Sequence, residues 1–176
     1  MRIGLIGRAD QTGLGIQSKE FYDHIPCKVL IIDSSALAPM EILKPNPEWY
    51  PGAKMYQLKP GFGMRGGIPH EVIDEFLKDL DLVFAMETPY DYNIFLLCRQ
   101  HGIKTVLQLN YEFLDFPSHL PPPDLFAAPS RWHYDLIPDK KVFLPVPVNT
   151  KKFNHQIKER TFVHIGGRPA MKDRNG

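Results

Sequence analysis

The chain has 176 residues, 43% of them hydrophobic and 23% charged, with a formal net charge of +1 at pH 7; this is an ordinary globular composition, and the length suits one large domain better than two. Because the sequence holds no dense block of Lys and Arg, it shows no electrostatic footprint for nucleic acid or an anionic membrane. No apolar run approaches the roughly 20 residues that a helix needs to span a bilayer, so we expect no transmembrane segment.

Apolar runs of strand length alternate with helical patterns along the chain. Residues 28–33 (KVLIID) are rich in β-branched side chains, which is typical of a buried parallel strand. Residues 70–80 carry apolar side chains at helical spacing behind Pro69. The alternation predicts an α/β fold with a Rossmann-like, doubly wound and mainly parallel sheet. The predicted strands are residues 3–7, 28–33, 55–59, 82–86, 105–109, 125–128, 142–145 and 162–165, and the predicted helices are residues 15–24, 70–80, 90–101 and 131–137.

Two segments interrupt this alternation. Residues 38–69 contain six prolines and five glycines, and the segment is far longer than a usual α/β connection. Residues 117–123 contain Pro-Pro-Pro and form a shorter, stiffer excursion. Long loops of this kind often carry function, and the alternative for both segments is an irregular covering of the surface.

A glycine-containing turn follows the first predicted strand. Its pattern, Asp10-x-Thr-Gly-Leu-Gly-x-x-Ser18, opens the first predicted helix, where backbone N–H groups and the helix dipole favour a phosphate or another anion. The turn has Gly13 and Gly15, but Ser18 stands where the dinucleotide fingerprint has a third glycine or alanine, and the turn lacks the Gly-Lys-Ser/Thr of a P-loop. The alternative is a tight strand–helix turn that binds no ligand.

Other chemistries have little support in the sequence. Cys27 and Cys98 are far apart, without Cys-x-x-Cys spacing or a secretory signal, which predicts a reducing, cytoplasmic setting. The seven histidines lack metal-ligand spacing, so no metal site is expected. Cys98 falls on an apolar helix face and is expected to pack in the core. Ser130 has no Gly-x-Ser-x-Gly motif around it, which argues against a hydrolase.

Several motifs, taken in order, resemble the N-terminal half of GT-B glycosyltransferases, most closely glycosyltransferase family 4. The motifs are the first glycine turn, Ala128-Pro-Ser-Arg131 at the start of a helix, Leu144-Pro-Val-Pro-Val-Asn149 with Phe153 after it, and the strand 162–165 followed by Gly166, Arg168 and Arg174. The resemblance implies an N-terminal, acceptor-side Rossmann-like domain over residues 1–150, a linker over 151–160, and the first strand and Gly/Arg turn of a donor-binding domain over 161–176. Glu87-Thr-Pro-Tyr90 with Asn110-Tyr-Glu112 is similar to a divergent, phage-borne branch.

The resemblance implies transfer of a sugar from a nucleotide-sugar donor, usually with retention of configuration and without a structural metal or a separate cofactor. The departing diphosphate must then be stabilised electrostatically. Arg168, with Lys172 or Arg174, matches the positions of the family's phosphate-binding cations, and Gly13 and Gly15 are expected to face them across the cleft. Arginine suits this role because its planar fork gives two directed hydrogen bonds. The alternative for the three cations is a solvated basic turn.

Polar side chains that follow strands supply the candidates for the acceptor side, because open α/β sheets bind ligands at the carboxyl ends of their strands. We predict that Glu87 or Glu112 orients or deprotonates an acceptor hydroxyl, and that Asp10, Tyr90 and Asn110 bind substrate. Alternatively, Glu87 caps the following helix and Tyr90 only packs. The family often has a histidine where Asn110 stands, and an amide cannot act as a base, so the catalytic arrangement departs from the family pattern.

The second half of the family's donor site has no counterpart in the sequence, including its acidic Glu-x7-Glu motif. We therefore expect the isolated chain to transfer little or no sugar. The acceptor, whether glycan, protein or modified nucleobase, is not specified. Two alternatives of other classes remain: a non-catalytic module that binds a glycan, nucleotide or protein, and a flavodoxin-like nucleotide-binding domain. Self-association through apolar cleft surface is a further expectation.

Overall fold

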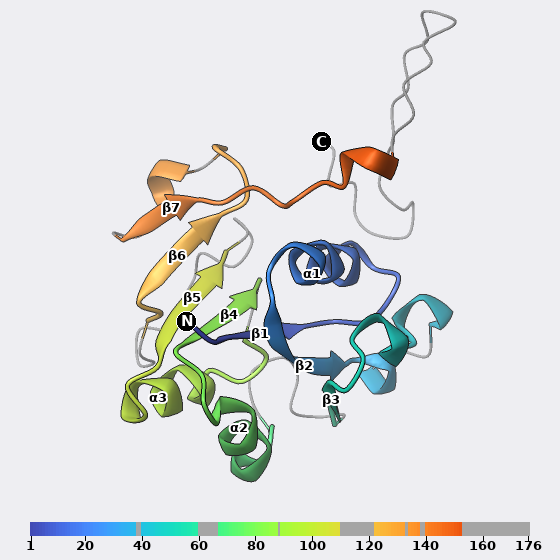
Figure 1. Ribbon diagram of the computed structural model, residues 1–176, viewed down its shortest axis with the longest axis horizontal. Helices are drawn as coiled ribbons and strands as arrows, with labels where there is room; N and C mark the ends of the chain where they lie inside the picture. The colour runs from blue at the N-terminus through green and yellow to red at the C-terminus, as the bar shows by residue number, and fades with distance from the viewer. Residues whose placement is uncertain are drawn as a thin grey trace, which may run out of the picture.

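The computed structural model describes residues 1–37, 40–59, 67–87, 89–109, 122–132, 134–137 and 140–152. These residues form a seven-stranded parallel sheet with the strand order β3-β2-β1-β4-β5-β6-β7 (Figure 1). In chain order the strands are β1 (Ile3–Gly7), β2 (Cys27–Asp33), β3 (Lys54–Gln57), β4 (Leu82–Met86), β5 (Lys104–Gln108), β6 (Leu125–Ala128) and β7 (Lys141–Phe143). The structure thus confirms the predicted α/β fold with a Rossmann-like sheet.

Helices cover both faces of the sheet. The α-helices of the described residues are α1 (Gly13–His24), α2 (His70–Leu77) and α3 (Asn93–Gln100); the 3-10 helices are η1 (Ser35–Leu37), η2 (Glu41–Leu43), η3 (Pro47–Trp49), η5 (Tyr134–Leu136) and η6 (Thr150–Lys152). Helix α1 lies on one face, and α2 and α3 lie on the other (Figure 1), so the sheet is doubly wound. Within the described part of the chain, no helix combines the length and the apolarity that crossing a membrane would need.

The core consists of two apolar clusters, one on each side of the sheet. On the α1 side, Phe21 meets Phe84 edge to face, with ring centroids 4.9 Å apart. On the other side, Phe76 of α2 and Phe95 of α3 are fully buried against the strands. Burial of a large apolar side chain contributes about 1.5–3 kcal/mol. Because β1, β2 and β4 are covered on both faces, their sequences are apolar almost throughout, as the strand prediction assumed.

The chain reverses its direction of travel across the sheet next to β1. From β1 it proceeds to β2 and β3 on one side, and then returns to place β4 to β7 on the other. Ile3 of β1 therefore pairs with Cys27 of β2 and also with Leu82 of β4. In such sheets the loops that leave β1 and β4 diverge and open a crevice at the carboxyl ends of these strands. A ligand site is therefore expected at this position.

The two predicted helices on the face opposite α1 have different ends in the structure. The helix predicted over residues 90–101 begins at Asn93, because Tyr90 has a φ of 61°, which is incompatible with an α-helix. The Asp91 carboxylate accepts a hydrogen bond from the Asn93 N–H at 2.9 Å and fixes the start of α3. The helix predicted over residues 70–80 ends at Leu77, shortly before Asp79 adopts a φ of 64°.

The helix predicted over residues 131–137 is wrong. Among the described residues of this stretch, 131–132 and 134–137, the structure has only the 3-10 turn η5. Tyr134 and Ile137 pack on the core, but Trp132 and Leu136 are 80% and 60% exposed, so only a small part of the segment has the packing that short helices need. In addition, Pro138 follows, and a residue before proline is disfavoured in helical conformation.

The predicted division into domains is mostly outside the part of the chain that the structure describes. Of the predicted linker, residues 151–160, the described part ends with Lys151 and Lys152 in η6. The predicted second unit, residues 161–176, including the strand 162–165, lies wholly outside the described residues. The domain boundary therefore stays a prediction.

Candidate functional site

The candidate site lies where β1 and β4 end side by side. Arg8 and Asp10 follow β1, and Glu87 and Tyr90 follow β4. The backbone N–H of Glu87 donates to the carbonyl oxygen of Gln108 at 2.7 Å, which holds the β4 loop against the end of β5. Burial raises the pKa of Tyr90, the Arg8 guanidinium opposes this shift, and the Glu87 and Asp10 carboxylates reinforce it, so these four side chains form one electrostatic group.

Arg8 and Asp10 form a buried ion pair within the glycine turn. The Arg8 Nε donates to Asp10 Oδ2 at 2.6 Å, and Arg8 Nη2 lies 2.5 Å from the same oxygen. The two residues are only 9% and 2% exposed. Asp10 Oδ1 accepts hydrogen bonds from the Thr12 N–H at 3.0 Å and the Thr12 hydroxyl at 2.5 Å. Both carboxylate oxygens of Asp10 thus stabilise the turn, and the predicted substrate-binding role of Asp10 stays a prediction.

The two glycines of the turn differ in what the fold requires of them. A Cβ on Gly15 would overlap the backbone carbonyl oxygen of Asp10 and lie 2.7 Å from its Oδ1, so a side chain at Gly15 is excluded by the turn itself. In the described part of the chain, a Cβ on Gly13 would meet no neighbouring segment within 4 Å. Gly13 is exposed and lies in the first turn of α1, which begins two residues earlier than predicted because Thr12 caps it, accepting from the Gly15 N–H at 3.2 Å. Packing therefore explains Gly15 and leaves Gly13 unexplained.

Ser18 replaces the third glycine of a dinucleotide fingerprint and has a structural role here. Its hydroxyl donates to the Leu14 carbonyl oxygen at 2.8 Å and accepts from the Arg8 N–H at 3.1 Å. A Cβ on Gly7 would lie 3.0 Å from both the Cβ and the Oγ of Ser18. In the dinucleotide fingerprint, the third glycine lets the helix approach the strand closely. In this chain, Gly7 of β1 allows that approach.

The segment between β2 and β3 stabilises the glycine turn through hydrogen bonds. The Gln11 N–H donates to the Ile42 carbonyl oxygen at 3.1 Å, and the Asn46 N–H donates to the Ala9 carbonyl oxygen at 2.5 Å. The hydroxyl of buried Tyr50 donates to the carbonyl oxygen of Arg8 at 2.9 Å. The first half of the Pro- and Gly-rich stretch thus stabilises the backbone of the turn, which sequence reasoning did not foresee.

The loop after β4 carries unusual backbone conformations. Glu87 and Tyr90 have φ values of 60° and 61°, in the left-handed region that side chains other than glycine rarely adopt. Each such residue costs about 1–3 kcal/mol, and these conformations cluster at active and ligand-binding sites. The Tyr90 side chain is 1% exposed and packs in the core, as one of its two predicted alternatives stated. The ligand-binding role of Tyr90 and the catalytic role of Glu87 stay predictions.

Five of the predicted site residues cannot be placed. These are Asn110, Glu112, Arg168, Lys172 and Arg174, which lie outside the described residues. Their predicted roles in catalysis, substrate binding and diphosphate binding therefore stay predictions. The described group at the switch point is Asp10, Gly13, Gly15, Glu87 and Tyr90, together with Arg8.

Sequence reasoning missed two residues of this region. Arg8 directly follows β1, and the rule that selected Glu87, a polar side chain after an apolar strand, would also have found it. The second is buried Asp91, whose Oδ2 accepts hydrogen bonds from the N–H groups of Gly67 and Ile68 at 3.1 and 3.2 Å. No local signal pointed to Asp91, because its partners lie far away in the sequence.

Among the described residues, no group of three or more His, Cys, Asp or Glu side chains is arranged to hold a metal ion. Comparisons of the chain with protein-family models, with curated proteins and with solved structures found no match. The chemistry of the site must therefore be argued from its own residues.

Proposed function

We propose that this chain is the N-terminal, acceptor-side domain of a GT-B glycosyltransferase of the family 4 type, followed by the beginning of its donor-binding domain. Its reaction is the transfer of a sugar from a nucleotide-sugar donor to an acceptor hydroxyl, with retention of configuration. The parallel sheet supports the proposal at a coarse level, because it has a glycine turn at a topological switch point, where α/β sheets bind ligands.

The observation that carries the proposal is the open space at Gly13. Gly15 and Gly7 are explained by close contacts within the fold, but a Cβ at Gly13 would meet no other part of the described residues within 4 Å. Gly13 also lacks the positive φ that would otherwise favour glycine. Glycine at such a place is expected where a ligand approaches the backbone closely. The adjacent N–H groups of the first turn of α1 suit an anion such as the donor diphosphate.

The proposed chemistry is electrostatic. The bond between the sugar and the diphosphate breaks, the diphosphate leaves with the electron pair, and the acceptor oxygen forms the new bond as its proton departs. The first turn of α1 at Gly13 stabilises the charge on one side, and Arg168 with Lys172 or Arg174 stabilises it on the other. Arg8 does not add a net positive charge, because Asp10 neutralises it.

The acceptor side of the proposal rests on the loop after β4. The backbone of Glu87 is held in a left-handed conformation beside the end of β5. A carboxylate at this edge can orient an acceptor hydroxyl and take its proton. Glu112 and Asn110, which follow β5 in the sequence, are proposed to complete this side.

Nucleotide binding by the purified chain tests the proposal. UDP, GDP and ADP are added separately at saturating concentration, and the melting temperature is measured. A ligand at 100 times its Kd stabilises by about 2.7 kcal/mol. We expect one of the three to raise the melting temperature, and the rise to be lost in Gly13→Ala and Arg168→Ala. Ile16→Ala, an exposed position of α1 that follows the turn, is the matched control and should retain it.

The outcome of this experiment also distinguishes the proposal from the main alternative. If no nucleoside diphosphate raises the melting temperature while glycans do, the chain is a non-catalytic binding module. If a nucleotide response persists unchanged in Gly13→Ala, the ligand does not approach the backbone at Gly13, and the observation that carries the proposal has another cause.

A further inference from the structure

The sheet has a notch at the amino end of β2. β3 begins at Lys54, which pairs with Leu30, so residues 27–29 of β2 extend past the start of β3. On that side, no strand of the described residues pairs with them. A strand without a neighbour presents backbone N–H and C=O groups that another molecule can bind. The notch is at the amino ends of the strands, whereas the switch point is at their carboxyl ends.

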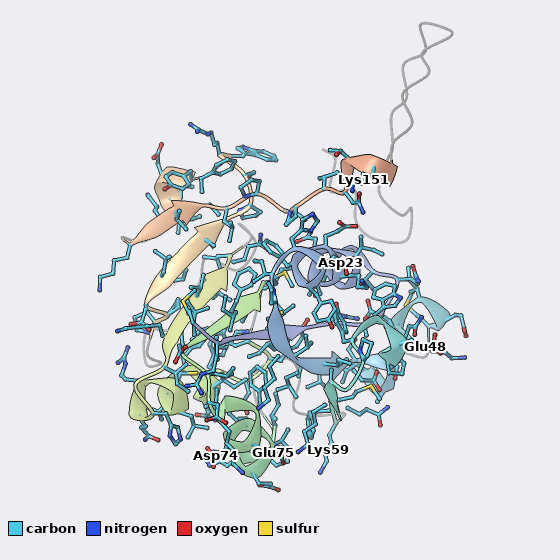
Figure 2. All side chains as sticks on the ribbon, viewed as in Figure 1. Asp23, Glu48, Lys59, Asp74, Glu75 and Lys151 are labelled. Atoms are coloured by element: carbon cyan, nitrogen blue, oxygen red, sulfur yellow. The ribbon has the colours of Figure 1, made fainter. Side chains whose placement is uncertain are left out.

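A hollow of about 420 Å³ lies at this notch. It is lined by residues 27–29 of β2, by residues 50–54 that lead into β3, by Tyr22 of α1, and by Glu75 and Phe76 of α2. Helices α1 and α2 lie on opposite faces of the sheet, as the labelled Asp23 and Glu75 show in Figure 2, so both helix layers contribute to the wall of the hollow. Small-molecule sites have volumes of about 300–1,000 Å³, and the hollow is within this range.

Much of the wall of the hollow is aromatic or apolar. Tyr50, Phe76 and Val29 are buried, and half-buried Tyr22 meets Tyr50 edge to face, with ring centroids 4.9 Å apart. Val29 and Tyr50 belong to the α1-side cluster, and Phe76 belongs to the cluster on the other face. Because these side chains are held by the core, the wall is preformed. A preformed aromatic wall favours a ligand with a flat apolar part.

One lysine of the lining has a fixed position and an uncompensated charge. The Lys28 Nζ donates to the backbone carbonyl oxygen of Glu75 at 2.8 Å and lies 5.8 Å from the ring centre of Phe76. The carbonyl is neutral, and an ammonium group has three N–H donors, so Lys28 keeps its charge and has donors left for a ligand. Lys54, in contrast, pairs with the Glu75 carboxylate. The hydrogen bond and the charge of Lys54 lower the pKa of Glu75, and the charges of Lys78 and Lys28 lower it further.

The lining residues thus combine a flat apolar wall with a small positive charge. Lys28 and Lys54 stand against Glu75 alone, which leaves one cation without an anionic partner. This balance fits a monoanion, whereas a phosphate dianion would bring a second negative charge. We propose that the hollow binds a small aromatic carboxylic acid, whose carboxylate accepts hydrogen bonds from the Lys28 ammonium while its ring packs against the aromatic wall. The site does not depend on the proposed function, because it is at the other end of the strands from Gly13.

Titration of the isotope-labelled chain with benzoate, followed through the NMR chemical shifts of the backbone amides, tests the proposal. We expect a dissociation constant of about 1 mM or lower, with the largest shifts at residues 27–29 and 52–54. Benzamide, which has the shape of benzoate without its charge, should bind at least about fivefold more weakly. Acetate, which has the charge without the ring, should also bind at least about fivefold more weakly than benzoate.

Two variants should change the affinity for benzoate in opposite directions. Lys28→Met keeps the aliphatic stem and removes the charge, so the dissociation constant should rise at least about fivefold; because Lys28 is exposed, this variant should fold normally. Glu75→Gln removes the one acidic side chain among the lining residues, so the dissociation constant should fall about two- to fivefold. Lys151→Met is the matched control: Lys151 is exposed on η6 and lies far from Glu75 in Figure 2, and the dissociation constant should not change.

Three results would overturn the proposal. The first is the lack of any saturable shift with benzoate up to about 10 mM. The second is equal binding of benzamide, or an unchanged dissociation constant in Lys28→Met, because the Lys28 charge is then not recognised. The third is a set of shifts that is largest at Gly13 and Gly15, because the anion then binds the first turn of α1 and the hollow is not its site.

Discussion

The contrast between Gly13 and Gly15 leads to a prediction of opposite sign for the same substitution. Both glycines lie in the first turn of α1, two positions apart. Alanine at Gly15 would place its Cβ on the Asp10 carbonyl oxygen, whereas alanine at Gly13 would enter open space. We therefore predict that Gly15→Ala strongly destabilises the chain and that Gly13→Ala leaves its stability equal or slightly higher.

The loss of unfolding free energy in Gly15→Ala can be worked out from the contacts that the substitution would disturb. Asp10 can move away from a Cβ at Gly15 only by disturbing its bonds to Thr12 and Arg8, or the backbone bonds that its neighbours Gln11 and Ala9 make with Ile42 and Asn46. Overpacking of a tight site costs about 1–3 kcal/mol, and each strained hydrogen bond adds about 0.5–1.5 kcal/mol. Alanine in place of glycine recovers about 0.5–1 kcal/mol of helix propensity. With a mid-range overpacking cost and one strained hydrogen bond, the net loss for Gly15→Ala is about 2 kcal/mol.

Urea unfolding measures this difference. Trp49 packs against the α1-side cluster and reports unfolding of this region by fluorescence. With a denaturant slope near 2 kcal/mol per M, the midpoint of Gly15→Ala should fall by about 1 M, and that of Gly13→Ala should stay within about 0.3 M of the wild type. A midpoint for Gly15→Ala close to the wild type, or equal losses in the two variants, would refute the steric reasoning.

Three further predictions concern other parts of the fold. Tyr50→Phe removes the hydroxyl that donates to the Arg8 carbonyl oxygen and should lower the free energy of unfolding by about 1–2 kcal/mol, measured by urea unfolding with Tyr22→Phe as the control. Asp124→Asn should also destabilise: burial alone would raise the pKa of Asp124, but hydrogen bonds from Thr105 and the charge of Lys104 lower it below 3.8. Because the folded pKa is the lower one, this stabilisation is present above pH 4 and is lost as the pH falls through the folded pKa, so the wild type and the variant should converge in acid; a constant difference would contradict this. Burial raises the pKa of Cys27 to about 11 and that of Cys98 to about 12, so iodoacetamide at pH 8 should modify Cys27 slowly and Cys98 only after unfolding, as peptide mass mapping will show; rapid modification of native Cys98 would contradict its burial.

The strands were predictable because their physical signal is local. β1, β4 and β6 have the predicted bounds, since each is a short apolar run between turn residues. The strand predicted over residues 55–59 is displaced to Lys54–Gln57 at the exposed edge, where no buried face defines its ends. The helical pattern around Trp132 was misleading because a short helix needs a full apolar face to pack on, and here Tyr134 and Ile137 pack on the core while Trp132 and Leu136 stay exposed.

The candidate site was only partly predictable. The position of a polar side chain after a strand is readable from sequence, and the structure places Glu87 and Tyr90 after β4 and Asp10 after β1. The distinct roles of Gly13 and Gly15 were not readable, because they depend on which atoms approach each Cα in space. The left-handed backbone at Glu87 was not readable either, because no residue type in that loop predicts it.

The hydrogen bonds between the β2–β3 segment and the glycine turn have a consequence for the order of folding. The hydrogen bond from Tyr50 to Arg8 spans 42 positions in the sequence, and those from Gln11 and Asn46 also join distant segments. During synthesis, β1, α1 and β2 emerge before residue 50 does, so the turn acquires its final geometry only after the following segment has collapsed onto it. The anion binding that we propose for the turn should therefore arise late, and a nascent chain that stops short of Tyr50 should lack it.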